Sequence, residues 1–437
     1  MITSPAWKDK KYAVLGLARS GRATVEALLA VGADVLVWDD RAEAREPYSG
    51  RCAIGDPLEA DLTGYAGVVV SPGVPLNTHP IKPHADSFGV PVIGDIELFA
   101  QARADLPPHK VVGITGTNGK STTTALVHHI LKTAGVPTTM GGNIGLPILE
   151  QEPLPEGGVY VLELSSYQID LTYSLDCDVA VLLNITPDHL DRYDGNFEKY
   201  AAAKARLFEM QSPESKALLY TDLEDASEAV LWLEDDFEDG TRPISADVEA
   251  MVKIDLNGLT LAPSLQGPHN HANASAAFYT GSYLGISEPM MGAALNNFAG
   301  LPHRMERIAE KSGVAYVNDS KGTNTAASAP ALTAFDKIHW ILGGLAKEPG
   351  LGKCEAELGH VKAAYTIGKA GPDFAALLEG RVPVEQCETL DRAVAVAAAK
   401  AEAGDTVLLS PACASFDQYA DFEKRGEHFR ALVEALK

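Results

Sequence analysis

The residues best suited to chemistry lie in one short stretch, VVGITGTNGKSTTTALVHHIL, at positions 111–131. An apolar run that predicts a buried strand leads into a glycine turn with Lys-Ser, and an apolar-periodic helix follows. This order is typical of a phosphate-binding loop. There, backbone N–H groups and a helix N-terminus hold phosphate oxygens, a lysine neutralises the outer phosphates, and a serine hydroxyl ligates Mg²⁺. The candidate residues are Gly116, Thr117, Asn118, Gly119, Lys120, Ser121 and Thr122.

The loop departs from the usual spacing, because Ile114 occupies the position of its first glycine and Gly113 and Gly116 flank it. A glycine-rich turn with an exposed lysine would explain the same residues without a ligand. The strand before the turn and the helix after it are the context that a phosphate-binding loop requires. We therefore expect a nucleoside triphosphate to bind here.

Two strands downstream of the loop end in side chains that suit a metal ion. The run VYVLEL places Glu163 in an apolar strand, where a carboxylate is costly to bury without a partner. We therefore favour a Mg²⁺ ligand over a turn or capping acid at this position. The strand DVAVLLN precedes the turn TPDHLD, which makes His189 a better ligand candidate than most isolated histidines.

Three further polar residues of the middle segment have two interpretations each. Lys204 sits among alanines in YAAAKARLF, and composition alone favours a lysine whose stem lies along the surface with its amine in water. Asn270 and Asn273 are three residues apart at the start of a helix and share a face. Their amides suit the edge of an adenine ring, and helix capping is the alternative.

The first segment carries a glycine turn, GLARSG, between an apolar strand and an apolar helix. The turn is similar to a dinucleotide fingerprint in which Ala18 replaces the middle glycine, and Asp39 ends the next strand, where an acid usually meets a ribose. One interpretation is a nucleotide or nucleotide-sugar site using Arg19, Ser20 and Asp39, and the other is a Rossmann-like turn without a ligand. Other strand ends and glycine turns of the first two segments carry Ser71, Gly73, Asn143, Ser165 and Gln168.

The last segment repeats the pattern of strand, turn and helix, and its polar residues again follow the strands. Parallel strands share one carboxyl edge, where open α/β sheets bind ligands. The candidates at these turns, and in LPHRMERI before them, are Arg304, Asp319, Lys321, Thr323, Lys347, Ser415 and Phe416.

The order of the expected elements indicates an α/β protein of three domains in series. A chain of 437 residues suggests about three domains at roughly 150 residues each. The proline-broken segment QARADLPPHK ends the first domain, and the second runs to about Gly300, just before LPHRMERI. The expected boundaries are therefore 1–107, 108–300 and 301–437. We expect a Rossmann-like N-terminal domain, a central ATP-binding mononucleotide domain built around the phosphate-binding loop, and a Rossmann-like C-terminal domain.

Composition narrows the classes of partner and compartment. The net charge of −23 disfavours nucleic acid and anionic membranes, so an anionic substrate would need local cations. No run of about 18 apolar residues indicates a membrane span, and the N-terminus lacks the apolar stretch of a signal peptide. The 5 scattered cysteines, without CxxC spacing, favour a reducing cytoplasm over disulfides or structural zinc.

Taken in order, the motifs of the chain resemble those of the Mur ligase family across all three domains. The segments that carry the resemblance are TGTNGKST, GGNIG, LELSSYQ, NITPDHLDRY, YAAAK, HNHANASAA, LPHRME, NDSKGTN and SPACASFDQY. The resemblance implies a cytoplasmic monomer that acts as an ATP-dependent acid–D-amino-acid ligase in peptidoglycan synthesis. Its substrates would be ATP, UDP-N-acetylmuramoyl-L-alanine and D-glutamate, joined through an acyl phosphate.

The resemblance also implies a role for each candidate residue. Lys120, His189 and Lys204 would be catalytic, and Lys204 would be carbamylated. Two Mg²⁺ ions would be held by Ser121, Glu163, His189 and Lys204. The phosphate-binding loop would bind ATP together with Asn270, Asn273, Arg304, Asp319 and Lys321. The UDP-linked substrate would lie against Arg19, Ser20, Asp39, Ser71, Gly73, Asn143, Ser165 and Gln168. D-glutamate would lie against Thr323, Lys347, Ser415 and Phe416.

The chain departs from the family near Lys347, where it reads GGLAK and close relatives often carry GGDGK. Loss of that acid bears on the amino-acid pocket and not on the class of reaction. The alternatives are a sibling enzyme that adds another amino acid, a folylpolyglutamate synthase, a nucleotide-binding regulator without ligation, and a nicotinamide-dependent oxidoreductase. The oxidoreductase leaves the phosphate-binding loop unexplained.

Overall fold

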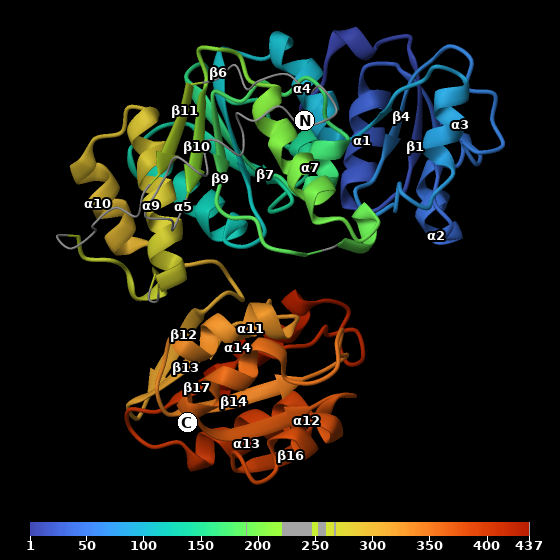
Figure 1. Ribbon diagram of the computed structural model, residues 1–437. Helices are drawn as coiled ribbons and strands as arrows, with labels where there is room; N and C mark the ends of the chain where they lie inside the picture. The colour runs from blue at the N-terminus through green and yellow to red at the C-terminus, as the bar shows by residue number, and fades with distance from the viewer. Residues whose placement is uncertain (189, 221–246, 252–258, 266–267, 437) are drawn as a thin grey trace. The chain divides into compact units, whose positions relative to one another are not determined.

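The computed structural model describes residues 1–188, 190–220, 247–251, 259–265 and 268–436. The chain divides into two compact units, which we call unit 1 (Met1–Gly258 with Ala272–Ala294) and unit 2 (Leu259–His271 with Leu295–Lys437). Within the described residues, unit 1 contains two β-sheets and unit 2 contains a third (Figure 1). Helices alternate with strands along the chain, so the expected α/β class is confirmed.

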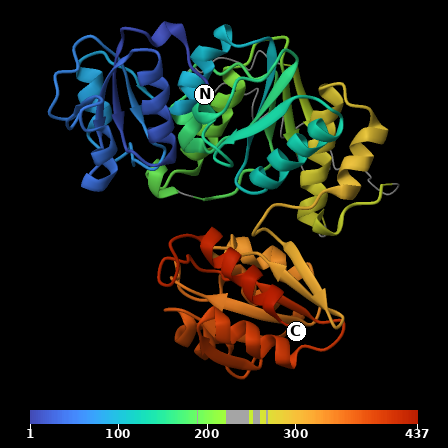
Figure 2. The ribbon, with the colours of Figure 1, turned by 180° about the vertical axis from the view of Figure 1, so that it is seen from behind.

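The first sheet is parallel and has helices on both faces (Figure 1, Figure 2). Its strand order is β3 (Ala53–Ile54), β2 (Asp34–Trp38), β1 (Lys11–Leu15), β4 (Tyr65–Val70) and β5 (Val92–Ile93). Its helical segments are η1 (Pro5–Trp7), α1 (Arg19–Ala30), α2 (Ala42–Arg45), η2 (Glu46–Tyr48), α3 (Ile81–Ser87), α4 (Asp95–Ala102) and η3 (Arg103–Asp105). Because successive side chains of a strand point to opposite faces, Val69 packs with α1 and α4, whereas Val68 and Val70 pack with α3.

The second sheet places the strand of the phosphate-binding loop among its inner strands. Its strand order is β11 (Asp247–Met251), β10 (Lys216–Tyr220), β9 (Val179–Leu182), β6 (His109–Thr115), β8 (Gly158–Glu163) and β7 (Thr138–Gly142). Its helical segments are α5 (Lys120–Thr133), η4 (Ile148–Glu150), α6 (Ser166–Asp170), η5 (Leu190–Tyr193), α7 (Phe197–Glu209), α9 (Pro268–Tyr283) and α10 (Glu288–Asn297). Strand β6 is buried from Val111 onward, which explains its unbroken apolar run.

The first two sheets share one hydrophobic core. Val14 of β1 and Leu162 of β8 belong to the same cluster of buried side chains. Polar contacts reinforce the junction, because buried Glu97 of α4 accepts hydrogen bonds from the backbone N–H groups of Tyr173 (2.7 Å) and Ser174 (3.0 Å). The two sheets therefore form a single packed body, which is unit 1.

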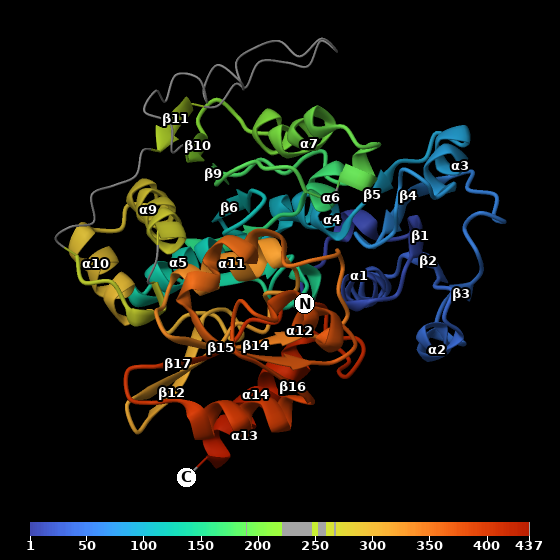
Figure 3. The ribbon, with the colours of Figure 1, turned by 60° about the horizontal axis from the view of Figure 1, so that its bottom comes forward.

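The third sheet has covered faces and one reversed edge strand (Figure 3). Its strand order is β12 (Glu306–Lys311), β13 (Val314–Asn318), β17 (Thr406–Leu409), β14 (Ile338–Gly343), β15 (Val361–Ile367) and β16 (Val384–Glu388). Its helical segments are η6 (Pro263–Leu265), α11 (Thr325–Thr333), η7 (Gly352–His360), α12 (Gly371–Leu378), α13 (Leu390–Lys400) and α14 (Phe422–Ala435). Along β14, Trp340 packs with α11 and α12, and Ile341 packs with α13 and α14. Strand β12 runs antiparallel to β13, so the expectation of a wholly parallel sheet is wrong at this edge.

One predicted site residue, His189, lies outside the described residues. Across the described part of the chain, no helix combines the length and the apolar character needed to cross a lipid bilayer.

Candidate active site

The phosphate-binding loop is built between β6 and α5 as the sequence predicted. Gly116 and Gly119 have φ angles of 150° and 86°, which glycine tolerates far better than other residues. A Cβ atom on Gly119 would lie 2.3 Å from the Oδ1 atom of Asn273. Asn184, which follows β9, holds the loop from the other side. Its backbone oxygen accepts from the Thr117 N–H, and its Oδ1 atom accepts from the Asn118 N–H, both at 2.9 Å.

Lys120 begins helix α5 and turns its amine back over the loop. The Nζ atom donates to the backbone oxygens of Gly116 and Thr117, both at 2.8 Å. The next residue, Ser121, is buried with 1% of its surface exposed, and Thr122 is half-buried. A phosphate group bound at the helix N-terminus would therefore meet the Lys120 cation and the partial positive charge of α5.

Lys204 of α7 is buried against the same loop, and the expectation that its amine reaches water is wrong. Only 1% of the residue is exposed, and Nζ donates to the backbone oxygen of Gly116 at 3.0 Å. The amine lies 4.7 Å from the centre of the Tyr200 ring. Burial, together with the nearby charge of Lys120, lowers the pKa of Lys204 to about 7. A substantial fraction of this amine is therefore neutral near pH 7.

Glu163 ends β8 with one carboxylate oxygen unsatisfied. The residue is 2% exposed, and Oε1 accepts a hydrogen bond from the Asn143 side chain at 2.9 Å. Oε2 is buried and has no hydrogen-bond partner among the described residues. A buried carboxylate oxygen without a partner is costly, so this atom fits a cation.

A metal site here would differ from a cage of protein ligands. Within the described ranges, no group of three or more His, Cys, Asp or Glu side chains is arranged to hold a metal ion. Mg²⁺ does not require such a group of protein ligands, because it commonly keeps several waters and is bound through one or two carboxylates and substrate phosphates. The donor set of Glu163 and Ser121 beside a phosphate-binding loop therefore fits Mg²⁺.

A cavity of about 320 Å³ lies between the phosphate-binding loop and the first sheet. Lys120 and Lys204 line it from one side, and Pro72 and Gly73, which follow β4, line it from the other. Its remaining lining residues are Thr117, Asn143, Ser165, Ser166, Tyr167, Asp188, Arg192 and Tyr200. The structure thus brings together candidates from both sheets of unit 1.

A second cavity of about 150 Å³ shares two wall residues, Pro72 and Asn143, with the larger one. It is lined by Arg19 and Ser20 at the start of α1 and by Gln168 of α6. The Arg19 guanidinium donates to the backbone oxygen of Gly145 at 2.6 Å. Ser165 and Gln168 form a capping box at the N-terminus of α6, which explains their spacing in the sequence.

Two candidates of the first segment support its turns and line neither cavity. Ser71 donates to the backbone oxygen of Gly16 at 2.8 Å. Asp39 accepts from the backbone N–H of Leu17 at 2.8 Å and pairs with Arg41 at 3.1 Å. Burial alone would raise the pKa of Asp39, but the hydrogen bonds from Arg41 and the two backbone N–H groups outweigh it and bring the pKa to about 2.

The two asparagines of α9 are both 5% exposed. Asn273 Oδ1 accepts from the Thr123 hydroxyl at 3.3 Å, beside the phosphate-binding loop. Asn270 donates to the backbone oxygen of Ser264 at 3.3 Å. Neither contact decides between an adenine-reading role and a structural one, so the adenine role stays a prediction.

The candidates of unit 2 gather at the carboxyl ends of β13 and β17. Asp319 is 7% exposed, its Oδ2 atom accepts from the Ser410 hydroxyl at 2.7 Å, and burial raises its pKa to about 7. Arg304 lies between His303 and Met305, whose φ angles are 63° and 47°. The Lys321 amine lies 4.8 Å from the centre of the Phe422 ring.

In the segment predicted to bind the amino acid, the position of the missing acid is tied by its backbone to the turn after β17. Leu345, which stands in that position, exchanges backbone hydrogen bonds with Ala414 at 2.8 and 3.0 Å. Lys347 donates to the Thr323 hydroxyl at 3.4 Å. The next two candidates differ in exposure, because Ser415 is buried at 2% and Phe416 is 69% exposed.

Sequence reasoning assigned no role to Arg425, although its segment DFEKRGEHF closes the chain. The residue is 1% exposed and donates to the Ser320 hydroxyl at 3.0 Å and to the Cys413 oxygen at 3.1 Å. Burial lowers its pKa to about 10. The signal available in the sequence was the helical spacing of Arg425 with Phe429 and Val433, which places the arginine on the apolar face of α14.

Asn184, Tyr200 and Arg192 are further residues at the site of unit 1 to which the sequence analysis gave no role. Tyr200 and Arg192 line the larger cavity, and Asn184 binds the phosphate-binding loop. Asn184 and Arg192 lie within the quoted segment NITPDHLDRY, and Tyr200 lies within YAAAK. Their contacts are with residues distant in the sequence, which no local pattern reveals.

Comparison with known proteins identifies related families and structures. Residues 114–281 match the family described as Mur ligase middle domain, and residues 303–413 match Mur ligase, glutamate ligase domain. The chain is 62% identical to a protein of Novosphingobium aromaticivorans, covering 100% of this chain and 97% of that protein. It is 56% identical to a protein of Sphingopyxis alaskensis, with 100% of both chains covered. Both relatives are named UDP-N-acetylmuramoylalanine–D-glutamate ligase.

Solved structures with low sequence identity to this chain support its fold and nothing further. The MurF ligase of Thermotoga maritima in complex with ADP aligns with a TM-score of 0.60 at 16% identity, over 99% of this chain and 97% of that one. UDP-N-acetylmuramate-alanine ligase MurC of the same organism aligns with a TM-score of 0.59 at 18% identity, over 98% and 100%.

Proposed function

The chain belongs to the Mur ligase family, and from this premise we propose that it is the ATP-dependent ligase that joins D-glutamate to UDP-N-acetylmuramoyl-L-alanine. The reaction forms an amide bond, releases ADP and phosphate, and belongs to peptidoglycan synthesis. The proposal includes a cytoplasmic monomer with domains at 1–107, 108–300 and 301–437.

One observation carries the proposal beyond family membership. The phosphate-binding loop and the loop after β4 face the same cavity, with Lys120 on one side and Pro72 on the other. A nucleotide at the first loop and a second anionic substrate at the other would meet inside it. A phosphoryl transfer between the two substrates needs this arrangement, because their reacting atoms must come within about 3–3.5 Å.

The chemistry follows from the poor reactivity of a carboxylate. The alanine carboxylate attacks the γ-phosphorus of ATP, the bond from that phosphorus to the β–γ bridging oxygen breaks, and ADP leaves. The resulting acyl phosphate has a good leaving group. The D-glutamate amine then attacks the carbonyl carbon through a tetrahedral intermediate and loses a proton, and phosphate departs.

The chain's own residues would position these anions and balance their charge. Lys120 and the N–H groups at the start of α5 would hold the β- and γ-phosphates, and the loop after β4 would hold the UDP-linked substrate. Electrostatic stabilisation of this kind is commonly the largest contribution to such a rate enhancement. The UDP-linked substrate would be bound by Arg19, Ser20, Asp39, Ser71, Gly73, Asn143, Ser165 and Gln168.

Mg²⁺ is part of the proposal. Ser121 and Glu163 would hold one ion, and His189 and a carbamylated Lys204 would hold a second. When bound, Mg²⁺ neutralises charge on the phosphate oxygens and thereby favours transfer. A carbamate on Lys204 requires a neutral amine that attacks CO₂, and its pKa of about 7 provides that form.

The remaining candidate residues would bind the nucleotide and the amino acid. Arg304, Asp319 and Lys321, with Asn270 and Asn273 of α9, would frame the nucleotide. Thr323, Lys347, Ser415 and Phe416 would receive D-glutamate. The cationic Lys347 is suited to a carboxylate of the incoming amino acid.

The test is release of ADP over a panel of D- and L-amino acids, with UDP-N-acetylmuramoyl-L-alanine as acceptor and mass spectrometry of the product. We expect turnover that depends on D-glutamate and a product heavier by one glutamyl residue. Turnover with another amino acid would identify a sibling enzyme, and turnover on a folate acceptor would identify a folylpolyglutamate synthase. ATP binding without turnover would indicate a regulator and refute the proposal. Lys120→Ala is the negative control, since it removes the cation of the phosphate-binding loop.

A further inference from the structure

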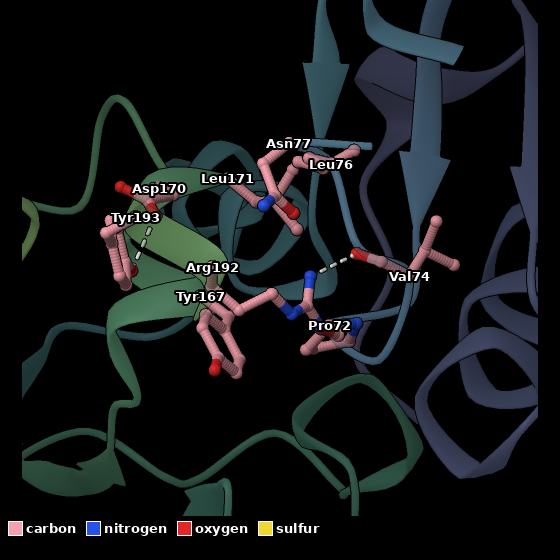
Figure 4. A pocket seen from close by; sticks show the side chains of 9 residues that line it. All are labelled: Pro72, Val74, Leu76, Asn77, Tyr167, Asp170, Leu171, Arg192 and Tyr193. Carbon is pink, nitrogen blue, oxygen red and sulfur yellow. Dashed lines mark hydrogen bonds between the residues drawn. The ribbon is translucent and has the colours of Figure 1, made fainter. Parts of the chain in front are cut away.

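One arginine joins two loops of unit 1 that the proposed function assigns to different substrates. Arg192 lies in η5, and its guanidinium donates hydrogen bonds to three consecutive backbone oxygens of the loop after β4. Figure 4 draws the bond to Val74. The distances are 3.2 Å to Pro72, 3.1 Å to Gly73 and 2.8 Å to Val74. A cation of the second sheet thus holds the loop at residues 72–74 of the first sheet.

An aromatic side chain fixes the guanidinium from α6. The carbon at the centre of the Arg192 guanidinium lies 4.3 Å from the centre of the Tyr167 ring. That ring stacks with Tyr193 at 6.3 Å, and the Tyr193 hydroxyl donates to Asp170 at 2.9 Å. No described carboxylate forms an ion pair with Arg192, so its charge meets carbonyl oxygens and an aromatic face.

The loop that Arg192 holds is a wall of every cavity described in unit 1. Pro72 lines the cavities of about 320 and 150 Å³ and also a smaller one of about 40 Å³ (Figure 4). Arg192 itself lines the smallest and the largest of them. The path of the backbone at residues 72–74 therefore determines the shape of the space that the UDP-linked substrate would occupy.

We propose that Arg192 is a positioning residue that orders the loop at residues 72–74 for the UDP-linked substrate and ties it to the nucleotide side of the cavity. This inference rests on the proposed function. The loop contains the exposed Gly73, and ordering such a segment during binding would cost conformational entropy. The planar guanidinium reaches three carbonyls at once, which the point charge of a lysine does not reproduce.

Two other residues of unit 1 provide matched controls. Arg206 makes similar contacts, because it donates to the backbone oxygens of Asp170 (3.2 Å) and Thr172 (2.9 Å) and lies over the Tyr173 ring at 5.2 Å. It differs in one respect, an ion pair with the Asp170 carboxylate at 3.8 Å. It does not line the cavities described above. Asn77 makes a second link between the two loops, to the Asp191 oxygen at 2.9 Å, and does not line the larger cavity.

The experiment compares Arg192→Ala, Arg192→Lys, Arg206→Ala and Asn77→Ala with the unmodified enzyme. Calorimetric titration with UDP-N-acetylmuramoyl-L-alanine gives its Kd, and steady-state assays give KM for each substrate. We expect Arg192→Ala to weaken binding of the UDP-linked substrate by about tenfold or more, the loss typical of one charge-assisted hydrogen bond. We expect Arg192→Lys to be intermediate, and KM for ATP to stay unchanged within error in both variants.

Thermal melts separate positioning from general support of the fold. Arg206→Ala and Arg192→Ala should lose similar stability, but Arg206→Ala and Asn77→Ala should keep the Kd of the unmodified enzyme. An unchanged Kd in Arg192→Ala would overturn the inference, and so would an equal loss in Arg206→Ala. If the unmodified enzyme does not bind or use the UDP-linked substrate, the proposed function itself fails.

Discussion

The amine of Lys204 lies beneath the phosphate-binding loop, where burial and the charge of Lys120 bring its pKa to about 7. A lysine that follows three alanines in a helix predicts a surface position, and only the packing of α7 against β6 and the loop after it reverses this. The local sequence therefore predicted a solvent-exposed amine where the structure has a buried one. The resemblance to a family gave the role, which stays a prediction.

We predict that Lys204→Ala loses activity by at least about a hundredfold, as when one preorganised charge-stabilising group is removed. Added formate or acetate should restore part of the activity, because a short carboxylate can replace the lost carbamate in the cavity left by the side chain. Carbon-13 NMR of the unmodified enzyme in ¹³C-bicarbonate should show a carbamate resonance that the variant lacks. Full activity in the variant, or no such resonance, would contradict the prediction.

Asp319 gives a pH-dependent prediction. Its pKa is raised by burial from 3.8 to about 7, so between these values the folded chain holds a proton that the unfolded chain has lost. The free energy of unfolding therefore falls as pH rises from about 4 to about 7. Above pH 7 the ionised Asp319 lowers that free energy by at most about 4 kcal/mol. Asp319→Asn should be more stable than the parent at about pH 8, with the difference largely absent near pH 4. Melting curves at both pH values check this, and an equal difference at both would refute it.

Among the elements, the turn between β6 and α5 depends most closely on residue type. Gly119 has a φ of 86°, and the Oδ1 atom of Asn273 lies 2.3 Å from where its Cβ would be. Gly135 has a similar φ of 77° with no atom within 4 Å of the same point. Both glycines adopt a left-handed backbone, but only Gly119 also lacks room for a methyl group. Comparing substitutions at the two positions therefore isolates the effect of the steric clash.

Gly119→Ala should reduce ATP-dependent turnover by at least about a hundredfold, because a displacement of about 1 Å in a positioning element can cost that much. Gly135→Ala should keep the turnover of the parent and lose only about 1–2 kcal/mol of stability, the cost of a side chain in left-handed backbone. Nucleotide binding by fluorescence and chemical unfolding measure the two effects. Near-normal ATP affinity and turnover in Gly119→Ala would show that the loop tolerates the methyl group.

The elements were predictable where the pattern was local. The strand, turn and helix around Lys120 follow from one apolar run, two glycines and one periodic stretch. Strand β12 was missed because ERIAEK has two apolar residues between two charged pairs, so it lacks the period-two pattern of a half-buried strand. The hairpin turn that joins it to β13, Ser312-Gly313 with φ angles of 51° and 76°, was the signal available in the sequence. Arg192 lies within the quoted segment NITPDHLDRY, but its role was missed because a single cation in a one-turn helix gives no periodic signal. Its carbonyl partners lie about 120 positions earlier in the sequence.

At the scale of the whole molecule, the distribution of buried side chains predicts how the protein unfolds. Leu28 lies in the core shared by the first two sheets, and Leu378 lies in a core of the third sheet. These clusters belong to different compact units. The boundary at residue 107 separates two sheets that share one core, so it does not mark a boundary of cooperative unfolding.

Scanning calorimetry should therefore resolve two transitions, one for each compact unit. Leu28→Ala and Leu378→Ala are a matched pair, both fully buried, and each should destabilise one transition by roughly 2–5 kcal/mol. The other transition should stay where it is in the parent. A single transition that both substitutions lower would show that the units unfold together.

The partition between the two cavities of unit 1 has a consequence for inhibitor chemistry. Asn143 stands in the wall common to both, and its amide is fixed by a hydrogen bond to Glu163. A compound with two lobes, joined by a thin linker that passes this amide, could fill both spaces at once. The tether would turn two weak fragments into one ligand, since the second fragment would bind at a high effective concentration.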